Sequence, residues 1–213
     1  MRAILKWLGR ALVLSAAAAS VVGLAAAPAL AATTWTVKPG GSFTGAAGST
    51  VVTDSTNGLS VTCSSSTIKG SLKSGSGLAG KGIGTVTSLA FKNCTVAGFT
   101  VSVTITGTMP INATVYNATT KTASLTITKI HGKLSVSSLG CSAIIDGTGA
   151  TAHNGMVKGK FNNTKDALKV LATGGNLHLY SVSSGCQGAV NSGDAVNFTT
   201  SYKFTPKTII KSP

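Results

Sequence analysis

Three histidines, four aspartates and many serines are among the residues of this chain that could take part in acid–base or nucleophilic catalysis. A serine hydrolase needs an exposed serine, a histidine and an orienting carboxylate. No G-x-S-x-G elbow marks a serine as a nucleophile. Asp146 and Asp194 each stand beside a glycine, as turn-forming aspartates do. We therefore expect no catalytic residue and no enzyme.

The same residues show no spacing that predicts a metal or cofactor site. His131, His153 and His178 lack ligand spacing, and we interpret them as structural histidines. The four aspartates are scattered and form no acidic cluster of the kind that binds calcium. The stretch Gly75–Gly80 fits G-x-G-x-x-G, but strand-forming residues surround it and no acidic residue follows about 20 positions later. We expect a flexible glycine–serine loop there, with no metal and no cofactor.

Four widely separated cysteines predict two disulfides in an exported protein: Cys63, Cys94, Cys141 and Cys186. Zinc ligands normally come in close pairs, which these cysteines do not form. Three pairings are possible. We favour Cys63 with Cys94 and Cys141 with Cys186, because sequential pairing closes the shorter loops, each contributing roughly 3 to 4 kcal/mol.

The start of the chain predicts export. Arg2, Lys6 and Arg10 form a positive region, an apolar run follows, and Ala29-Leu30-Ala31 is a small-x-small cleavage site. We expect residues 1–31 to be a signal peptide and residues 32–213 to be a single secreted β domain. No later segment is long and apolar enough to cross a bilayer as a helix. The mature product is then extracellular, either released or held at the cell wall by non-covalent contacts.

The expected mature chain is strongly basic. It keeps fifteen lysines against four aspartates, a formal charge of +11, and has no arginine or glutamate. Nucleic acid is not an expected partner, because its recognition depends on arginine forks and aromatic platforms. The lysines either form a solvated face or attract anionic cell-wall polymers or lipid headgroups. For the second role we name four candidates: Lys158, Lys160, Lys165 and Lys169.

Apolar and polar residues alternate along much of the chain, as in strands with one buried face. Phe99–Thr106 and Val196–Thr205 show this alternation most clearly. No window has a convincing helical period. Eight further strands are expected near 50–53, 59–63, 85–93, 111–116, 123–130, 156–161, 168–172 and 177–182. Asn57-Gly58 and Asn154-Gly155 favour type I′ hairpin turns.

These elements predict an all-β fold that is cross-linked by two disulfides. An antiparallel β-sandwich and a closed β-barrel both accommodate many short strands at this spacing. The sequence does not choose between the two architectures.

Several stretches resemble a group of small secreted actinobacterial proteins. They are Trp35-Thr36-Val37-x-Pro39-Gly40-Gly41, Gly70–Leu78, Phe91-x-x-Cys94 and Gly174–His178. The similarity spans nearly all of residues 32–213. Because that group has no assigned activity, the resemblance implies an exported β domain and no particular reaction.

Two functional hypotheses follow. The first is a secreted, non-catalytic protein that binds anionic cell-envelope or extracellular polymers through its lysine-rich surface. The alternative is a carrier or binder of a small apolar molecule, held in a barrel or sandwich cavity, since such a cavity needs no ionisable residue.

Overall fold

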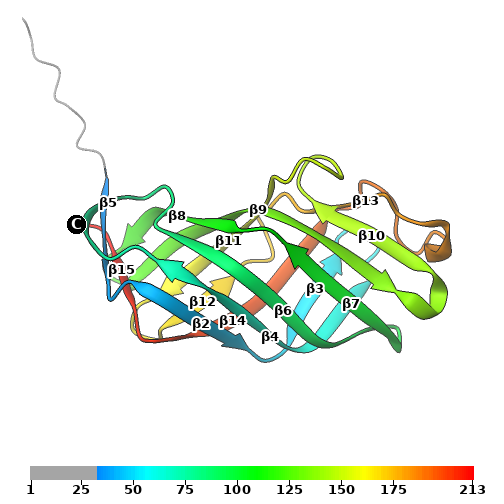
Figure 1. Cartoon of the computed structure of the whole chain (residues 1–213), viewed down its shortest axis with the longest axis horizontal. Helices are drawn as coiled ribbons and strands as arrows, with labels where there is room; N and C mark the ends of the chain where they lie inside the picture. Colours follow the sequence, from blue (N-terminus) through cyan, green and yellow to red (C-terminus); the bar gives the residue numbers. More distant parts are fainter. Residues whose placement is uncertain (1–32) are drawn as a thin grey trace, which may run out of the picture. The chain divides into compact units, whose positions relative to one another are not determined.

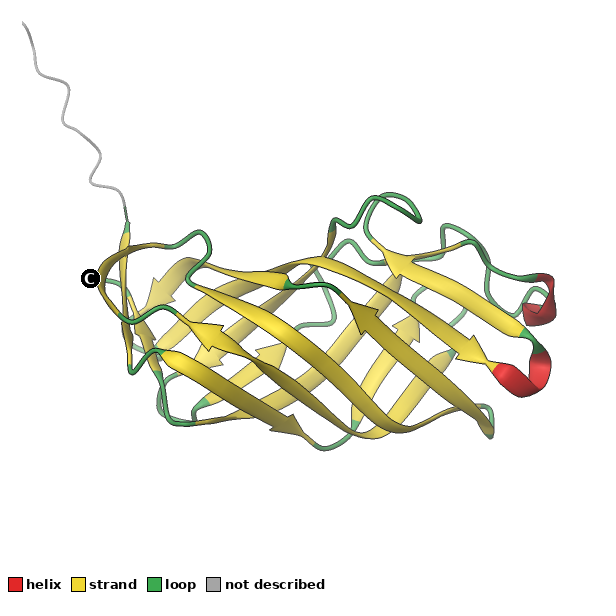
Figure 2. Ribbon diagram, in the orientation of Figure 1, coloured by secondary structure: helices red, strands yellow, loops and turns green. Residues whose placement is uncertain are grey.

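The structure, a computed structural model, describes residues 33–213, which belong to one folded unit. Strands make up 64% of it and helices 3%, which confirms the all-β prediction (Figure 2). The predicted signal peptide, residues 1–31, lies outside the described residues. Among residues 33–213 no helix has the length and apolar character to cross a membrane.

Within residues 33–213, fifteen strands and two short 3-10 helices follow one another (Figure 1). They are β1 (Thr34–Lys38), β2 (Gly41–Ala47), β3 (Thr50–Asp54), β4 (Ser60–Leu72), β5 (Gly75–Ala79), β6 (Gly84–Val96), β7 (Phe99–Thr106), β8 (Met109–Asn117), β9 (Thr122–Val136), η1 (Ser137–Leu139), β10 (Cys141–Asp146), β11 (Gly155–Asn162), β12 (Ala167–Val170), β13 (His178–Tyr180), η2 (Ser184–Cys186), β14 (Val196–Thr205) and β15 (Ile209–Lys211).

The main sheet closes on itself as an eight-stranded antiparallel barrel, which decides between the two predicted architectures. Strands β4, β6, β9 and β14 run through it without a break. The other four positions are each filled by two successive strands in line: β2 with β3, β7 with β8, β10 with β11, and β12 with β13. Neighbours in the barrel are therefore neighbours in sequence, and β14 closes the ring by pairing with both β2 and β3.

The four broken positions divide the barrel into two halves. We call the half that contains β2, β8, β11 and β12 the base half, and the half that contains β3, β7, β10 and β13 the mouth half. In the mouth half, β13 and β14 are joined by a bridge between His178 and Ala195 and by a hydrogen bond from Val196 N to Leu177 O, 2.9 Å. Both halves are thus closed rings of hydrogen-bonded strands.

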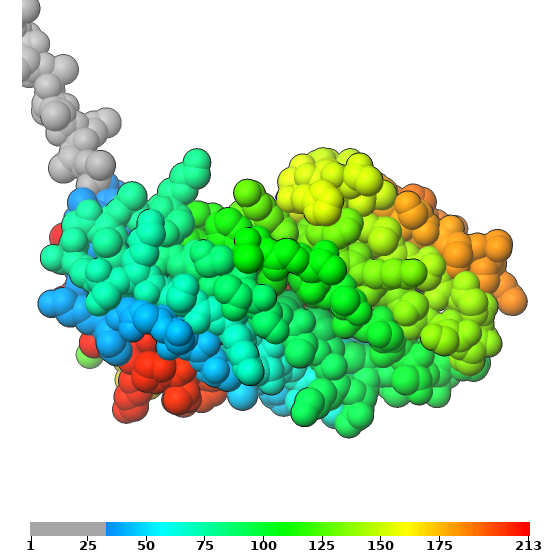
Figure 3. All heavy atoms as spheres, in the orientation of Figure 1, coloured from blue at the N-terminus to red at the C-terminus, as the bar shows by residue number. Residues whose placement is uncertain are grey.

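A separate three-stranded sheet, β15-β1-β5, lies at the end of the base half (Figure 1). Its inner residues Trp35, Val37 and Ile210 are at most 1% exposed. A Cβ atom at Gly80 would lie 2.7 Å from the Trp35 indole nitrogen, so only glycine lets the chain pass this ring. The space-filling view shows the blue and red ends of the described chain meeting here, with the orange residues before β14 at the other end (Figure 3).

The barrel interior contains one buried polar cluster. Thr50 hydrogen-bonds to Ser66 (2.7 Å) and to Thr200 (2.9 Å), and the Ser66 hydroxyl donates to the Tyr202 hydroxyl (3.0 Å). All four residues are at most 5% exposed. Burial raises the pKa of Tyr202 to about 12. The hydrogen bond from Ser66 lowers this pKa, but by less than burial raises it.

Both expected disulfides are present and the favoured pairing is confirmed. Cys63–Cys94 joins directly opposed residues of β4 and β6. Cys141–Cys186 joins β10 to η2, across 45 residues of chain. Two disulfides indicate that the protein folds in an oxidising environment.

The ten expected strands all overlap observed strands, but five observed strands were not expected. They are β1, β2, β5, β10 and β15. The prediction of a flexible loop at Gly75–Gly80 is wrong. Residues Gly75–Ala79 form strand β5, which pairs with β1. Its backbone hydrogen bonds to β1 override the low strand propensity of glycine.

The two expected type I′ turns are also wrong. A type I′ turn needs positive φ at both central residues. Gly58 has it and Asn57 does not, and neither Asn154 nor Gly155 does. The Asn57 and Asn154 side chains instead accept hydrogen bonds from the amides of Leu59 and Thr148, which shapes longer connections.

Removal of the second disulfide tests its contribution to stability. The double variant Cys141→Ser/Cys186→Ser should lower the free energy of unfolding by about 4 kcal/mol, because the unfolded chain regains the freedom of a 45-residue loop. Urea unfolding of the variant and the parent measures the difference. Equal midpoints and slopes would contradict this stabilising role.

The buried tyrosine predicts a loss of stability at high pH. In the unfolded chain Tyr202 ionises near pH 10, while the folded state holds its proton to about pH 12. Its contribution is complete below pH 10 and is lost as pH rises from 10 to 12, by about 3 kcal/mol. The measurement is the difference in unfolding free energy between the parent and Tyr202→Phe, because the contributions of all other titrating groups cancel in that difference. It should fall by about 3 kcal/mol as pH rises from 10 to 12. A difference that is constant with pH would refute the assignment.

Candidate functional site

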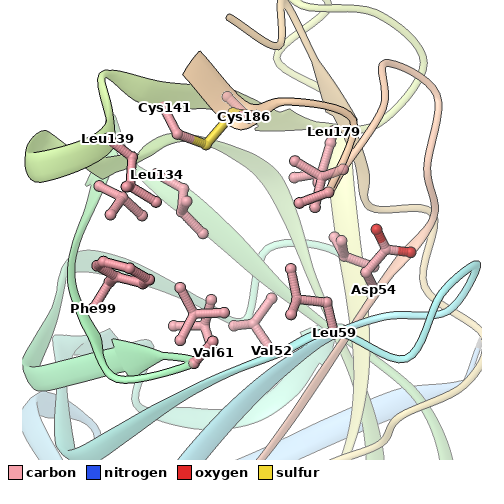
Figure 4. Close-up of a pocket in the computed structure, with 17 residues that line it drawn as sticks. Val52, Asp54, Leu59, Val61, Phe99, Leu134, Leu139, Cys141, Leu179 and Cys186 are labelled. Atoms are coloured by element: carbon pink, nitrogen blue, oxygen red, sulfur yellow. A yellow bond between two sulfur atoms is a disulfide. The ribbon is translucent and has the colours of Figure 1, made fainter. Parts of the chain in front are cut away.

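A pocket of about 200 Å³ lies in the mouth half of the barrel, and we call it the mouth pocket. Its labelled side chains surround a common space in Figure 4. Sixteen of the seventeen lining residues are apolar or disulfide-bonded: Val52, Leu59, Val61, Val96, Ala97, Phe99, Leu134, Val136, Leu139, Cys141, Ala143, Leu179, Cys186, Ala189, Val190 and Val196. They come from both sides of the closed barrel, so the fold itself forms the pocket.

The outer rim of the mouth pocket is apolar and reaches solvent. Phe99 follows the β6–β7 turn and is 42% exposed, and Leu139 in η1 is 43% exposed. Ala97 and Ala189 are also exposed. The lining residues of the mouth pocket that are exposed to solvent are therefore all apolar.

The two 3-10 helices hold one side of the rim in a fixed geometry (Figures 2 and 4). The Cys141–Cys186 disulfide joins the start of β10, two residues after η1, to the last residue of η2. The Ser183 hydroxyl donates to Gly140 O (2.9 Å) and accepts from the Ser142 amide (2.9 Å). A Cβ atom at Gly185 would lie 2.4 Å from Gly140 O, so this close approach requires glycine.

Asp54 is the single ionisable residue that lines the mouth pocket, and its carboxylate is engaged elsewhere. It accepts hydrogen bonds from the Thr56 amide (2.7 Å) and from the Asn57 side-chain amide (3.1 Å). The same Asn57 nitrogen donates to Ala189 O (2.7 Å), which ties the turn after β3 to the segment after η2. Asp54 thus supports the pocket wall.

Smaller cavities continue along the barrel interior beyond the mouth pocket. One of about 30 Å³ shares Val52 with it, and one of about 20 Å³ shares Phe198 with the second. Phe91 and Phe198 both line the cavity of about 30 Å³ and meet edge to face, with ring centroids 6.0 Å apart. Packed side chains fill the rest of the interior, and they are apolar except for the cluster of Thr50, Ser66, Thr200 and Tyr202.

Among residues 33–213 the histidines lack the serine partner that a Ser-His-Asp triad needs. One histidine is paired with a carboxylate, His131 with Asp146. The hydrogen bonds of the histidine rings within the described residues reach Asp146, Gly147 and Asn176, and none reaches a serine hydroxyl.

The four candidate polymer-binding lysines lie together in the base half. Lys158 and Lys160 lie on the exposed face of β11, and Lys160 is directly opposite Lys169 of β12. Lys165 lies in the turn between these strands, where its carbonyl accepts a hydrogen bond from the Lys203 ammonium. The four candidate lysines and Lys203 together form a cationic patch that we call the β11–β12 patch.

Charge is distributed unevenly along the barrel axis. All fifteen lysines of residues 33–213 are exposed and all four aspartates are buried. Twelve lysines and Asp166 belong to the base half and the sheet at its end. The mouth half contains Lys133 and the other three aspartates. The junction between the halves contains Lys92 and Lys129. The net positive charge of residues 33–213 therefore lies on the base half, the sheet at its end and the junction between the halves.

Sequence analysis did not identify the mouth pocket. Its lining comes from segments spread over residues 52–196, including β10, which was not expected as a strand. One signal of the pocket is present in the sequence. Phe99 and Leu139 are large apolar residues next to the turn glycines Gly98 and Gly140, where a solvated loop would have polar residues.

Comparison with models of known protein families, with curated proteins and with solved structures gives no match to this chain. Function therefore has to be argued from the mouth pocket and the surface charges.

Proposed function

We propose that this protein binds and carries a small, uncharged apolar molecule in the mouth pocket. The observation that supports this most directly is a solvent-reaching pocket of about 200 Å³ whose lining has sixteen apolar or disulfide residues and one engaged aspartate. Eight-stranded barrels have interiors wide enough for packed side chains or for one small ligand. Here the base half contains packed side chains and the mouth half contains the pocket.

The volume limits the size of the enclosed group. A cavity of about 150 Å³ lined by aliphatic and aromatic residues binds benzene, whereas sites for drug-sized ligands span about 300 to 1,000 Å³. The mouth pocket lies between these sizes. It fits one ring or a short alkyl chain, or that end of a longer molecule whose remainder passes between Phe99 and Leu139.

The lining also determines the charge of the ligand. A charged group transferred into this pocket would lose its water without gaining a partner, because Asp54 is already bonded to Thr56 and Asn57. Affinity must come from apolar area removed from water. The rim held by Cys141–Cys186 is already ordered, so binding loses little conformational entropy.

We infer a second, separate function for the base half, the attachment of the protein to anionic polymers outside the cell. The excess of lysine over aspartate in that half favours it, because an anionic surface would attract the base half and leave the mouth pocket facing solvent. Secretion and the removal of residues 1–31 belong to this proposal. Neither function requires a chemical reaction.

A series of straight-chain alcohols tests the pocket. Calorimetric titration should give an affinity that rises about fourfold for each added methylene, until the pocket is full and the affinity levels off. Val136→Phe fills part of the pocket, so the levelling should occur at a shorter alcohol.

The matched control is Val115→Phe, which adds the same ring at a position that is 61% exposed in the base half. This variant should bind as the parent does. Absence of binding by the parent, or equal effects of the two variants, would rule out the mouth pocket as the site.

Two triple variants of equal charge test the polymer proposal. Lys158→Gln/Lys160→Gln/Lys169→Gln removes three charges from the β11–β12 patch, and Lys92→Gln/Lys129→Gln/Lys133→Gln removes three elsewhere. Co-sedimentation with insoluble anionic polymer should weaken more for the first triple variant. Binding by the parent should also fall as salt shortens the screening length below about 8 Å. Equal losses for the two variants would contradict an oriented attachment.

A further inference from the structure

We propose that His131 and His153 bind one divalent transition-metal ion, Zn²⁺, Cu²⁺ or Ni²⁺, on the outer face of the barrel, with Asp146 holding both residues in position. We call these three residues the histidine site. It is separate from the mouth pocket and from the β11–β12 patch. The chain brings it together from β9, the end of β10 and the connection 147–154.

Asp146 is the centre of this arrangement. Its side chain is fully buried and accepts four hydrogen bonds. One oxygen accepts from the amides of Gly147 (2.6 Å) and Asn154 (3.0 Å), and the other from His131 Nδ1 (2.8 Å) and the His153 amide (2.9 Å). A buried carboxylate with four donors is fully satisfied, so it orients its neighbours and is not itself left free to bind a ligand.

The hydrogen bonds keep this carboxylate charged. Burial alone would raise its pKa, but the His131 side chain and three backbone amides together lower the pKa of Asp146 to about 2. The ring of His131 is held in place by this carboxylate, because its Nδ1 lies 2.8 Å from one carboxylate oxygen. This is the arrangement in which a carboxylate fixes the ring of a metal-binding histidine and strengthens its other nitrogen as a ligand.

The connection 147–154 places the second imidazole against the first. It is held to Asp146 by the amides of Gly147, His153 and Asn154, and Asn154 closes it further by a hydrogen bond with the Thr148 amide, 2.9 Å. His153 has φ +48° there. Its ring lies with its centroid 4.0 Å from that of His131. The connection is therefore an ordered support for His153.

The two rings have nitrogens available for a metal. Within residues 33–213, His131 Nε2 and both nitrogens of the exposed His153 ring have no hydrogen-bond partner. One ligand atom of each of His131, Asp146 and His153 lies within 4.8 Å of the others. Imidazole nitrogens suit zinc, copper and nickel. Because His153 is exposed, its side chain can turn to complete the pair, and water fills the remaining coordination positions.

His178 provides an internal comparison. It is adjacent to Asp146 in the sheet register, but its Nδ1 lies 3.0 Å from Gly147 O and 2.9 Å from Asn176 O. It does not belong to the group whose ligand atoms lie together. The chain thus contains one histidine that supports the same loop without being part of the proposed site.

The experiment is a calorimetric titration of purified protein without a polyhistidine tag, using ZnCl₂ or CuCl₂ alone. The parent should bind one ion per chain. His153→Ala changes an exposed side chain, and His131→Gln keeps a donor toward Asp146. Each should weaken metal binding by at least the roughly 10- to 100-fold that loss of a ligand's hydrogen-bond partner causes. His178→Ala should bind as the parent does. With Cu²⁺, electron paramagnetic resonance should show coupling to two imidazole nitrogens, reduced to one in each single variant.

Three results would overturn the proposal. They are no binding by the parent up to millimolar metal, unchanged binding in both His153→Ala and His131→Gln, and an equal loss in His178→Ala. Because His153 is exposed, its variant should unfold at the same urea concentration as the parent when no metal is present. This measurement separates the loss of a ligand from the loss of the fold.

Discussion

Closure of the barrel by β14 is the constraint on which the other features depend. Strand β14 pairs with β2 and β3, so that Lys203 lies opposite Ala46 and Asn197 opposite Thr53. These contacts join residues near the two ends of the described chain. An open sheet would expose two edges and one apolar face to water. Once the sheet is closed, its apolar face becomes an interior, and that interior forms a pocket wherever side chains do not fill it.

The four aspartates show how a strongly basic chain uses its few negative charges. Each is buried, and three of them accept hydrogen bonds from nearby backbone amides: Asp54 from Thr56, Asp146 from Gly147, His153 and Asn154, and Asp194 from Asn191. Asp166 lies 3.8 Å from the Lys203 ammonium, a largely exposed group. Because the carboxylates support turns and loops, the side-chain charge exposed on residues 33–213 is that of lysine alone.

The predictable parts of the fold are those with a local signal. Alternation in Phe99–Thr106 and Val196–Thr205 was enough to predict β7 and β14. Strand β2 was missed because Gly, Ser and Ala carry little strand propensity, and it is held by pairing with β4 and β14. The choice of a barrel depends on contacts such as that of Ala46 with Lys203, which no local pattern reports. The mouth pocket has the same origin, because its lining residues range from Val52 to Val196.

Strand β10 shows why one short segment supports two unrelated sites. Side chains alternate along a strand, so Cys141 and Ala143 point inward and line the mouth pocket, while Asp146 lies on the other face beneath the connection 147–154. The mouth pocket depends on apolar area and the histidine site on an oriented imidazole, and they share no side chain. A change at His153 leaves the pocket lining intact, and a change at Val136 leaves the bonds to Asp146 intact. The two sites can therefore be tested independently, because the pleat of β10 keeps them on opposite faces of the barrel wall.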